Sequence, residues 1–389
     1  MSNQLESFVA DKKETIENVM EILQQGAEIL ASTVGELFPI FQIAAPIVQL
    51  ALDNVDSNEA KYVKEQFQIV KDKIEVLTEE LEDIAKEIAK SKIDLKYSII
   101  EETLESQFRK YMDILNAKPQ FRDVKKNLFL DHYSKSGGSK NLYTLYDAVM
   151  GNNSFGESIL DIAVRYEQNN RRVMEDFCAR LKKLFCLGLI ALMGHAAVIG
   201  DDHEAVAKKW HEKMQDVENK MKDVINNCIE SFAEQAQRDT EKLIKDSNGR
   251  SNRQLAKYIH NFLKKKYDWI NWSVRVYNHS SSWQSKEKYH FLVGKSQLEN
   301  FKVNNSHVVI SYTSKPQPID KDEIRQLMEG LDKKTDDSAR VVEYINENMP
   351  GCVIHAVARY RDIWAAWNFP EECYYWENYR NVTLYVHSE

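Results

Sequence analysis

The sequence predicts a mainly α-helical protein, with an elongated antiparallel helical bundle over residues 1–248 and a smaller, aromatic-rich α+β domain over residues 249–389. Apolar residues recur three or four positions apart through most of the first part, as they do on amphipathic helices. Only 13 Gly and 7 Pro occur among 389 residues, which favours long helices. Beyond residue 253, where six of the seven tryptophans lie, alternating strand patterns replace this helical spacing. The length also favours two domains.

The clearest helical pattern runs over residues 63–88, where apolar positions alternate in steps of four and three, and a similar seam covers residues 16–41. The helical pattern then continues to Leu115 and ends at Lys118-Pro119, because proline cannot continue a helix. Further helical spacing begins near Glu157, and another long pattern reaches Phe232 and ends at residues 245–252. Heptad seams close within one chain or between two, so the sequence leaves both a monomer and an oligomer open.

The second domain is expected to contain four or five strands and two helices. Strand patterns cover residues 269–277, 306–314, 352–360 and 381–388, and helical patterns cover 320–331 and 336–348. In the first strand, alternation places Trp272, Val274 and Val276 on one face, and Ser273 and Arg275 on the other.

Residues 184–200, "LFCLGLIALMGHAAVIG", carry no Asp, Glu, Lys or Arg. Seventeen residues reach the lower limit for a membrane-spanning helix, but at about 1.5 Å per residue they extend only about 25 Å. His195 and three glycines also disfavour a permanent anchor. The segment is therefore either a core helix of the bundle or a conditional membrane segment. The candidate membrane residues are Leu184, Leu187, Leu189, Ile190, Leu192, Met193, Val198 and Ile199.

A second apolar stretch, residues 34–52, contains Glu36 and two prolines, and is expected to form a kinked, buried hairpin that could accompany the first.

The segment "IWAAWNFPEECYYWENY", residues 363–379, is the candidate aromatic contact surface. Tryptophan and tyrosine favour protein interfaces, where one end of the side chain stays hydrated, but the same rings also close the core of a small domain. The candidate residues are Trp364, Trp367, Tyr374, Tyr375 and Trp376.

No motif predicts catalysis, cofactor binding or a metal site. "VGKS" at residues 293–296 lacks the first glycine of a phosphate loop, since Tyr289 stands there, and His203 and His211 are eight positions apart instead of four. We therefore expect a protein that is not an enzyme and has no cofactor. The net charge of −8 argues against a nucleic-acid partner. Five scattered cysteines and the absence of a signal-peptide pattern favour reduced thiols and a cytoplasmic location.

Two stretches of the sequence resemble the rapunzel family of fish proteins. They are "LFCLGLIALMGHAAVIGDDHEAVAKKWHEKMQDVENKM" and, more specifically, "KYDWINWSVRVYNHSS". That family in turn resembles the cephalotoxin-like proteins of invertebrates. The resemblance implies a regulatory, protein-binding role in growth, skeletal development or innate immune signalling, and it supplies no enzymatic residues.

The toxin relatives instead imply membranes, and long helices around an apolar segment resemble helical pore-forming toxins of the cytolysin-A type. Two functions therefore remain open: a regulatory protein with an unidentified protein partner, and a membrane-active protein that inserts residues 184–200 into a lipid membrane on activation. In the second case the protein would be membrane-associated only after activation.

Overall fold

The computed structural model describes most of the chain beyond residue 93 and parts of the chain before it. The described residues are 44–49, 51–53, 61–62, 64–69, 94–151, 156–247, 249–278, 289–303, 305–331, 337–358, 363–379 and 381–389, with single positions 7, 13, 14, 17, 58 and 72. The seam predicted over residues 16–41 and most of the seam over 63–88 lie outside these residues. The chain divides into two units, Met1–Glu230 and Ser231–Glu389, and each is described by itself.

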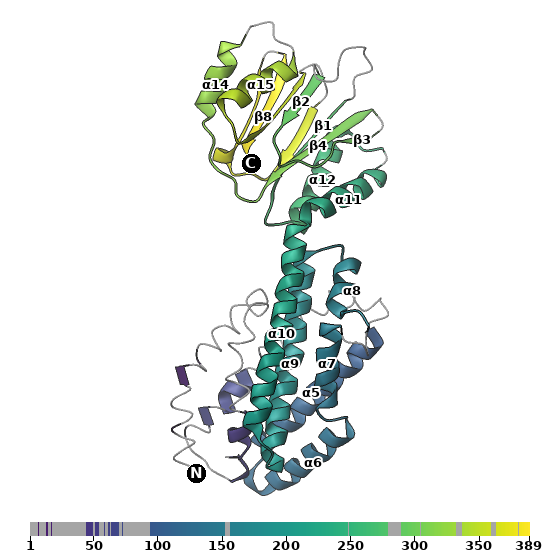
Figure 1. Ribbon diagram of the computed structural model, residues 1–389, viewed down its shortest axis with the longest axis vertical. Coiled ribbons are helices and arrows are strands. Elements are labelled where there is room, and N and C mark those ends of the chain that lie inside the picture. The colour runs from purple at the N-terminus through teal and green to yellow at the C-terminus, as the bar shows by residue number, and fades with distance from the viewer. Residues whose placement is uncertain are drawn as a thin grey trace. The chain divides into compact units, whose positions relative to one another are not determined.

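The first unit is an antiparallel helical bundle, as the sequence predicts. Its two longest helices, α9 and α10, have 29 and 28 residues and pack along each other (Figure 1). Helix α5 packs against α6, α7 and α9. The bounds are α5 (Asp94–Asn116), the 3-10 turn η1 (Pro119–Phe121), α6 (Arg122–Lys135), α7 (Lys140–Met150), α8 (Ile159–Tyr166), α9 (Arg171–Ile199) and α10 (His203–Glu230).

The helix ends follow the chemistry of the residues that flank them. Helix α5 ends at Asn116, just before Pro119, as predicted. The pattern predicted to run from Glu157 into the apolar segment is instead broken at Gln168 and Asn169, whose φ angles are 53° and 55°. Helix α9 then starts after Asn170, whose side chain accepts a hydrogen bond from a backbone N–H of the first turn.

The boundary between the units lies at residues 230 and 231, earlier than the predicted boundary at residue 248. The helical pattern predicted to continue through Phe232 is interrupted at Ser231, so α10 ends and α11 (Phe232–Lys245) begins. Helix α11 contributes Ala236 to the core of the second unit, where it packs with α12 (Asn252–Lys266). Helical spacing continues across this break, so periodicity could not show which core α11 joins.

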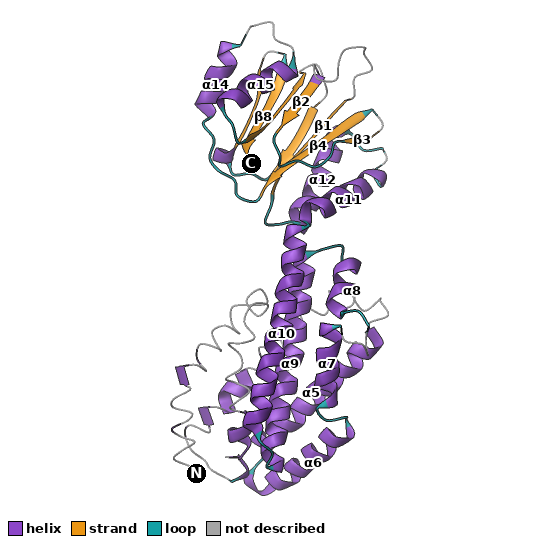
Figure 2. Ribbon diagram, in the orientation of Figure 1, coloured by secondary structure: helices purple, strands orange, loops and turns teal. Residues whose placement is uncertain are grey.

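The second unit contains two antiparallel four-stranded sheets (Figure 2). The first has the order β3-β4-β1-β6 and the second the order β2-β5-β8-β7. Helix α12 packs on the first sheet, and α15 packs on the second. The bounds are β1 (Asn271–Asn278), β2 (His290–Val293), β3 (Phe301–Val303), β4 (Ser306–Thr313), α14 (Lys321–Gly330), α15 (Ser338–Asn348), β5 (Cys352–Ala358), β6 (Ile363–Trp367), the 3-10 turn η2 (Glu371–Cys373), β7 (Tyr374–Tyr379) and β8 (Val382–Ser388).

The described part of the second unit has more strands than the four or five that were predicted. The α+β class and both predicted helices are confirmed. The additional strands are short or aromatic. Strands β2 and β3 have four and three residues, and β6 and β7 fall in the segment interpreted as a contact surface. Neither kind carries the alternating β-branched pattern on which strand prediction depends.

Asp239 connects α11 to the end of α12. It is 5% exposed, and its carboxylate accepts hydrogen bonds from Lys266 Nζ at 2.6 Å and from the Tyr267 hydroxyl at 2.7 Å. The other carboxylate oxygen accepts from Gln235 Nε2 at 2.8 Å. Removing this carboxylate would leave a buried ammonium group without its counter-charge.

We therefore expect Asp239→Ala to lower the free energy of unfolding of the full chain by about 3–5 kcal/mol, measured by urea denaturation with tryptophan fluorescence. Glu241→Ala, on an exposed position of the same helix, is the control and should change it by less than about 0.5 kcal/mol. Equal effects of the two substitutions would contradict a structural role for the Asp239 network.

Candidate functional site

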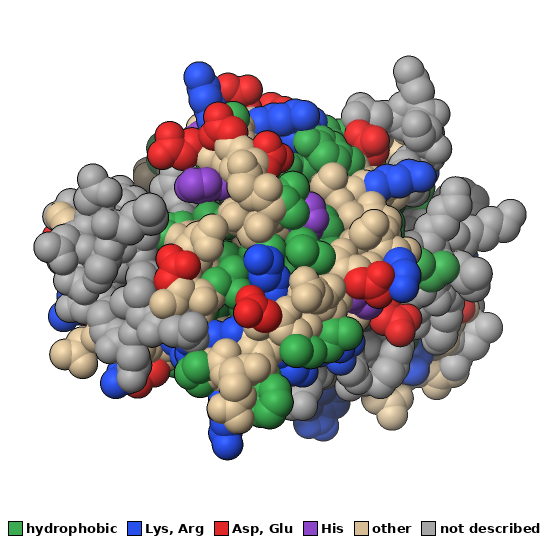
Figure 3. Space-filling view, turned by 90° about the horizontal axis from the view of Figure 1, so that it is seen from below, with side chains coloured by type: hydrophobic (Ala, Val, Ile, Leu, Met, Phe, Trp, Pro, Cys, Tyr) green, Lys and Arg blue, Asp and Glu red, His purple; other side chains and the backbone are tan. Residues whose placement is uncertain are grey.

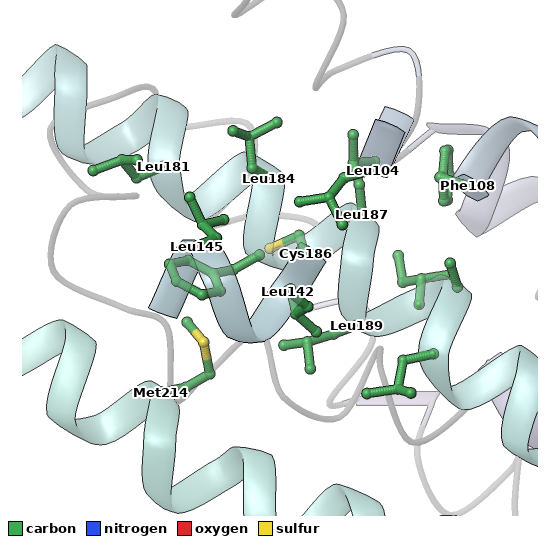
Figure 4. Close-up of a cluster of buried hydrophobic side chains, with 14 of the residues drawn as sticks. Leu104, Phe108, Leu142, Leu145, Leu181, Leu184, Cys186, Leu187, Leu189 and Met214 are labelled. Atoms are coloured by element: carbon green, nitrogen blue, oxygen red, sulfur yellow. The ribbon is translucent and has the colours of Figure 1, made fainter. Parts of the chain in front are cut away.

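The apolar segment predicted from the sequence forms the second half of α9 and lies inside the core of the first unit. Figure 4 shows Leu184, Leu187 and Leu189 among side chains of neighbouring helices. The exposed fraction is at most 8% for Leu184, Leu187, Leu189, Ile190, Leu192 and Met193. Val198 is half-buried, and Ile199, the last residue of the helix, is 53% exposed.

Among the described residues, one helix has the length and composition to cross a membrane, and it is α9. Most of its apolar window, 83%, is buried inside the structure. The segment thus combines the composition of a membrane helix with the environment of a core helix.

Two glycines allow neighbouring helices to approach α9 closely. A Cβ atom at Gly194 would lie 2.3 Å from Cε2 of Tyr111 on α5, and one at Gly188 would lie 2.6 Å from Cδ1 of Leu142 on α7. Both separations are shorter than any normal carbon contact, so each glycine provides the space that a neighbouring side chain occupies. From the sequence, these glycines were interpreted as evidence against a permanent membrane anchor. In the structure, they allow α5 and α7 to pack closely against α9.

Charged residues at the start of the apolar segment pair with α5. Arg180 Nε donates to Glu101 Oε1 at 3.0 Å, and Lys183 Nζ donates to Glu105 Oε1 at 3.2 Å. Lys182 is fully buried, and this burial lowers the pKa of its ammonium group to about 8. These contacts fix α9 against α5 at the point where the chain enters the core.

The second predicted apolar stretch contributes to the same core. Residues 44–49 and 51–52 are helical, and Ala44, Ala45, Ile47 and Val48 are buried there. The Tyr111 hydroxyl donates to the Ala44 carbonyl oxygen at 2.9 Å. Residues 34–43 lie outside the described part of the chain, so the predicted hairpin is described only in its second half.

Two side chains close the C-terminal end of the apolar segment. Gln49 Nε2 donates to the Ala197 carbonyl oxygen on α9 at 3.2 Å. His195 stacks on Tyr133 with ring centroids 4.2 Å apart, and partial burial lowers the pKa of the histidine.

The five aromatic residues predicted as one contact surface do not form one. Trp364 is 40% exposed on β6 of the first sheet, and Trp376 is 48% exposed on β7 of the second. Tyr374 and Tyr375 are each 4% exposed, and Trp367 is half-buried and stacks on Tyr374 at 5.0 Å. The Trp367 and Trp376 ring centroids are 6.1 Å apart, so Trp367, Tyr374 and Trp376 lie together, whereas Trp364 lies on the opposite face of β6.

Exposed apolar side chains do gather on η1 and α6, where Phe121, Val124 and Leu128 are 52%, 55% and 48% exposed. Their spacing of three and four places them on one side of the helix. On the face of the molecule seen in Figure 3, hydrophobic side chains lie among acidic and basic ones. We call these three residues the α6 ridge. The ridge was not identified from the sequence, although the spacing of its residues can be recognised in the sequence.

Sequence reasoning also missed a polar layer between the two sheets. Strand β1 directs Trp272, Val274 and Val276 to the core shared with α12, and directs Ser273, Arg275 and Tyr277 to the opposite sheet. The prediction of two distinct faces is correct, but the polar face is buried: Arg275 is 0% exposed. Histidines from four further strands join this layer, namely His290, His307, His355 and His387.

Burial and the Arg275 charge keep the central histidines neutral. Burial first, and then the neighbouring Arg275 and His290, lower the pKa of His355 well below its ordinary value. The pKa of His387 falls to about 3, chiefly because of burial. A second positive charge beside a buried guanidinium is unfavourable in a low-dielectric interior.

No cluster of His, Cys, Asp and Glu that could hold a metal ion occurs among the described residues. The five cysteines are buried and form no disulfide, and burial raises the pKa of Cys178 and Cys186 to about 12. These thiols are therefore protonated and weakly nucleophilic at neutral pH.

Comparison with known proteins agrees with a helical first unit. Residues 54–249 match the model of the cephalotoxin-like middle helical domain. The chain is also 34% identical to Protein rapunzel of Danio rerio over 219 residues, which are 56% of this chain and 96% of that protein. No solved structure matches. The chain belongs to the rapunzel family and carries a cephalotoxin-like middle helical domain.

The close approach at Gly194 can be tested by adding one methyl group. We expect Gly194→Ala to lower the free energy of unfolding by about 1–3 kcal/mol, because the Tyr111 ring must move out of a packed core. Ile199→Ala changes an exposed residue of the same helix and should have less than half that effect. Thermal or urea unfolding of the full chain measures both, and a stabilising Gly194→Ala would exclude the packing role.

The buried histidines predict that acid destabilises the second unit. His355 and His387 have folded-state pKa values below the value of about 6.5 expected in the unfolded chain. Below pH 6.5 the unfolded state therefore binds protons that the folded state does not bind. Each histidine lowers the free energy of unfolding by about 1.4 kcal/mol per pH unit, down to its folded pKa, which is about 3 for His387.

Urea denaturation between pH 7.5 and 5 measures this slope. His355→Phe is expected to reduce it, and His211→Phe, at a half-buried position of α10 in the first unit, is the matched control. A slope that His355→Phe does not alter would contradict this assignment.

Proposed function

We propose that this protein is a non-enzymatic regulatory protein of the rapunzel type, which works by binding another protein in growth, skeletal development or innate immune signalling. The observation that carries the proposal is the 34% identity to Protein rapunzel across 96% of that protein. We place this activity in the cytoplasm, where the five buried cysteines, which form no disulfide, remain reduced.

The packing of α9 supports a role in which the apolar segment stays inside the bundle. Its core side chains are buried, its glycines accommodate Tyr111 and Leu142, and Lys183 pairs with Glu105. The α6 ridge provides exposed apolar side chains for contact with a protein partner.

A membrane-active function is the alternative, and the composition of α9 favours it. This function requires α9 to leave the bundle, since a buried segment cannot enter a lipid bilayer. The two functions therefore differ in whether α9 must separate from α7 and α5.

A removable covalent link between α7 and α9 separates the two functions. Cγ of Leu142 lies 3.5 Å from the position of a Cβ on residue 188, a separation that a disulfide between Leu142→Cys and Gly188→Cys can span. The double substitution also removes the Leu142 methyl group that would collide with the new side chain.

We expect the oxidised and reduced forms of this double variant to act equally, because regulation does not require α9 to move. The readout is dye release by the purified double variant from vesicles of phosphatidylcholine and phosphatidylserine at neutral and acidic pH, with the oxidation state of the disulfide set before the vesicles are added. The double variant with Glu105→Gln added loosens α5 from α9 and serves as a sensitised control.

Dye release by the reduced form that disappears on oxidation would overturn the regulatory proposal in favour of membrane insertion. The wild-type chain with and without reductant controls for effects of the reductant itself.

A further inference from the structure

The polar layer between the two sheets contains a buried cation whose hydrogen bonds are incompletely satisfied. Arg275 lies in the middle of β1, and its side chain is 0% exposed. Nη2 donates to Ser311 Oγ at 2.5 Å, while Nε and Nη1 are buried without a hydrogen-bond partner. The Arg275 guanidinium lies 5.7 Å from the centre of the Tyr385 ring.

The protein groups around Arg275 form a chain of hydrogen bonds that leads away from it. His387 Nδ1 lies 2.8 Å from the Ser388 carbonyl oxygen, so this nitrogen must carry the proton. His387 Nε2 then accepts from Ser311 Oγ at 2.7 Å. Ser311 thus uses its hydroxyl hydrogen on His387 and accepts from Arg275, and it has no negative charge to offer.

Other polar groups in the same layer have atoms without partners. Both ring nitrogens of His355 and the Tyr277 hydroxyl are buried and make no hydrogen bond. The rings of these two residues are 5.9 Å apart, and they are 0% and 2% exposed. A neutral histidine and a tyrosine can each donate one hydrogen bond to a common acceptor.

No carboxylate balances the guanidinium within the described strands. The side chains directed between the sheets are Ser273, Arg275, Tyr277, His290, Leu292, Lys302, His307, Val309, Ser311, Thr313, Val353, His355, Val357, Ile363, Ala365, Trp367, Tyr374, Trp376, Asn378, Thr383, Tyr385 and His387. Neither Asp nor Glu occurs among them.

The tyrosines of this layer do not supply a negative charge either. Burial raises the pKa of Tyr277, Tyr374 and Tyr385 above the ordinary value, so these phenols stay protonated. An arginine remains charged even when buried. A buried charge without a counter-charge costs several kcal/mol, and folded proteins avoid such a cost by pairing the charge.

We propose that the layer between the two sheets binds a small oxyanion, of the carboxylate or phosphate class, through Arg275, with Tyr277 and His355 as additional hydrogen-bond donors. An oxyanion fits better than a single-atom anion because the unpaired N–H and O–H groups come from three different side chains. Several oxygen atoms can accept from separate donors at once, and guanidinium groups match carboxylate and phosphate geometry.

The test measures the unfolding midpoint of the full chain, by tryptophan fluorescence, in increasing sodium acetate and increasing sodium phosphate. Sodium chloride at equal ionic strength is the baseline. A ligand that binds only the folded state raises the midpoint in a saturable way. We expect one of the two oxyanions to do so, and the stronger one identifies carboxylate or phosphate as the class.

Arg275→Met removes the charge and keeps most of the aliphatic stem. We expect at least a tenfold loss of apparent oxyanion affinity, with no loss of midpoint in the chloride baseline, because an unpaired buried charge has been removed. Arg340→Met, at an exposed position of α15 in the same unit, is the matched control and should behave like the wild type.

If neither acetate nor phosphate raises the unfolding midpoint above the sodium chloride baseline, the proposal is overturned. It is also overturned if the midpoint of Arg275→Met depends on the oxyanion concentration as strongly as that of the wild type. If Arg275→Met does not fold, Tyr277→Phe decides the question, since it removes one hydroxyl and no charge. Weaker oxyanion affinity in Tyr277→Phe supports the site, and unchanged affinity overturns it.

Discussion

The close packing of α9 against α5 and α7 is the constraint on which the first unit depends. Gly194 accepts the Tyr111 ring, and the Tyr111 hydroxyl in turn reaches the Ala44 carbonyl oxygen. One tyrosine therefore joins three segments that are far apart in the sequence. This contact exists only because glycine at position 194 has no side chain. The packing of α9 against α5 therefore depends on a missing Cβ atom as well as on the apolar side chains that α9 carries.

This constraint also determines what would hold α9 in the bundle if a membrane were near. Hydrophobic burial does not distinguish the two environments, since lipid tails are as apolar as the leucines around α9. Shape-matched packing and ion pairs do distinguish them, because both are lost when the helix leaves. The pairs of Arg180 with Glu101 and Lys183 with Glu105 lie where the apolar segment begins, so separation would break them together with the packing.

The sequence predicted what depends on local pattern and missed what depends on pairing between distant strands. The end of α5 before Pro119 and the apolar segment of α9 follow from neighbouring residues. The burial of Arg275 does not, because a polar face on an isolated strand normally faces water. It is buried here since β5, β7 and β8, from the end of the chain, cover that face.

The two units differ in what their interiors require. The core of the first unit is apolar, and Arg180 and Lys183 pair with Glu101 and Glu105 at its edge. The interior of the second unit places a guanidinium and neutral histidines between two sheets, so we expect its stability to depend on pH. Burial also lowers the pKa values of Lys182 and His195 in the first unit, and both residues lie on α9. Titratable groups that burial perturbs therefore lie on the central helix of the first unit and between the two sheets of the second.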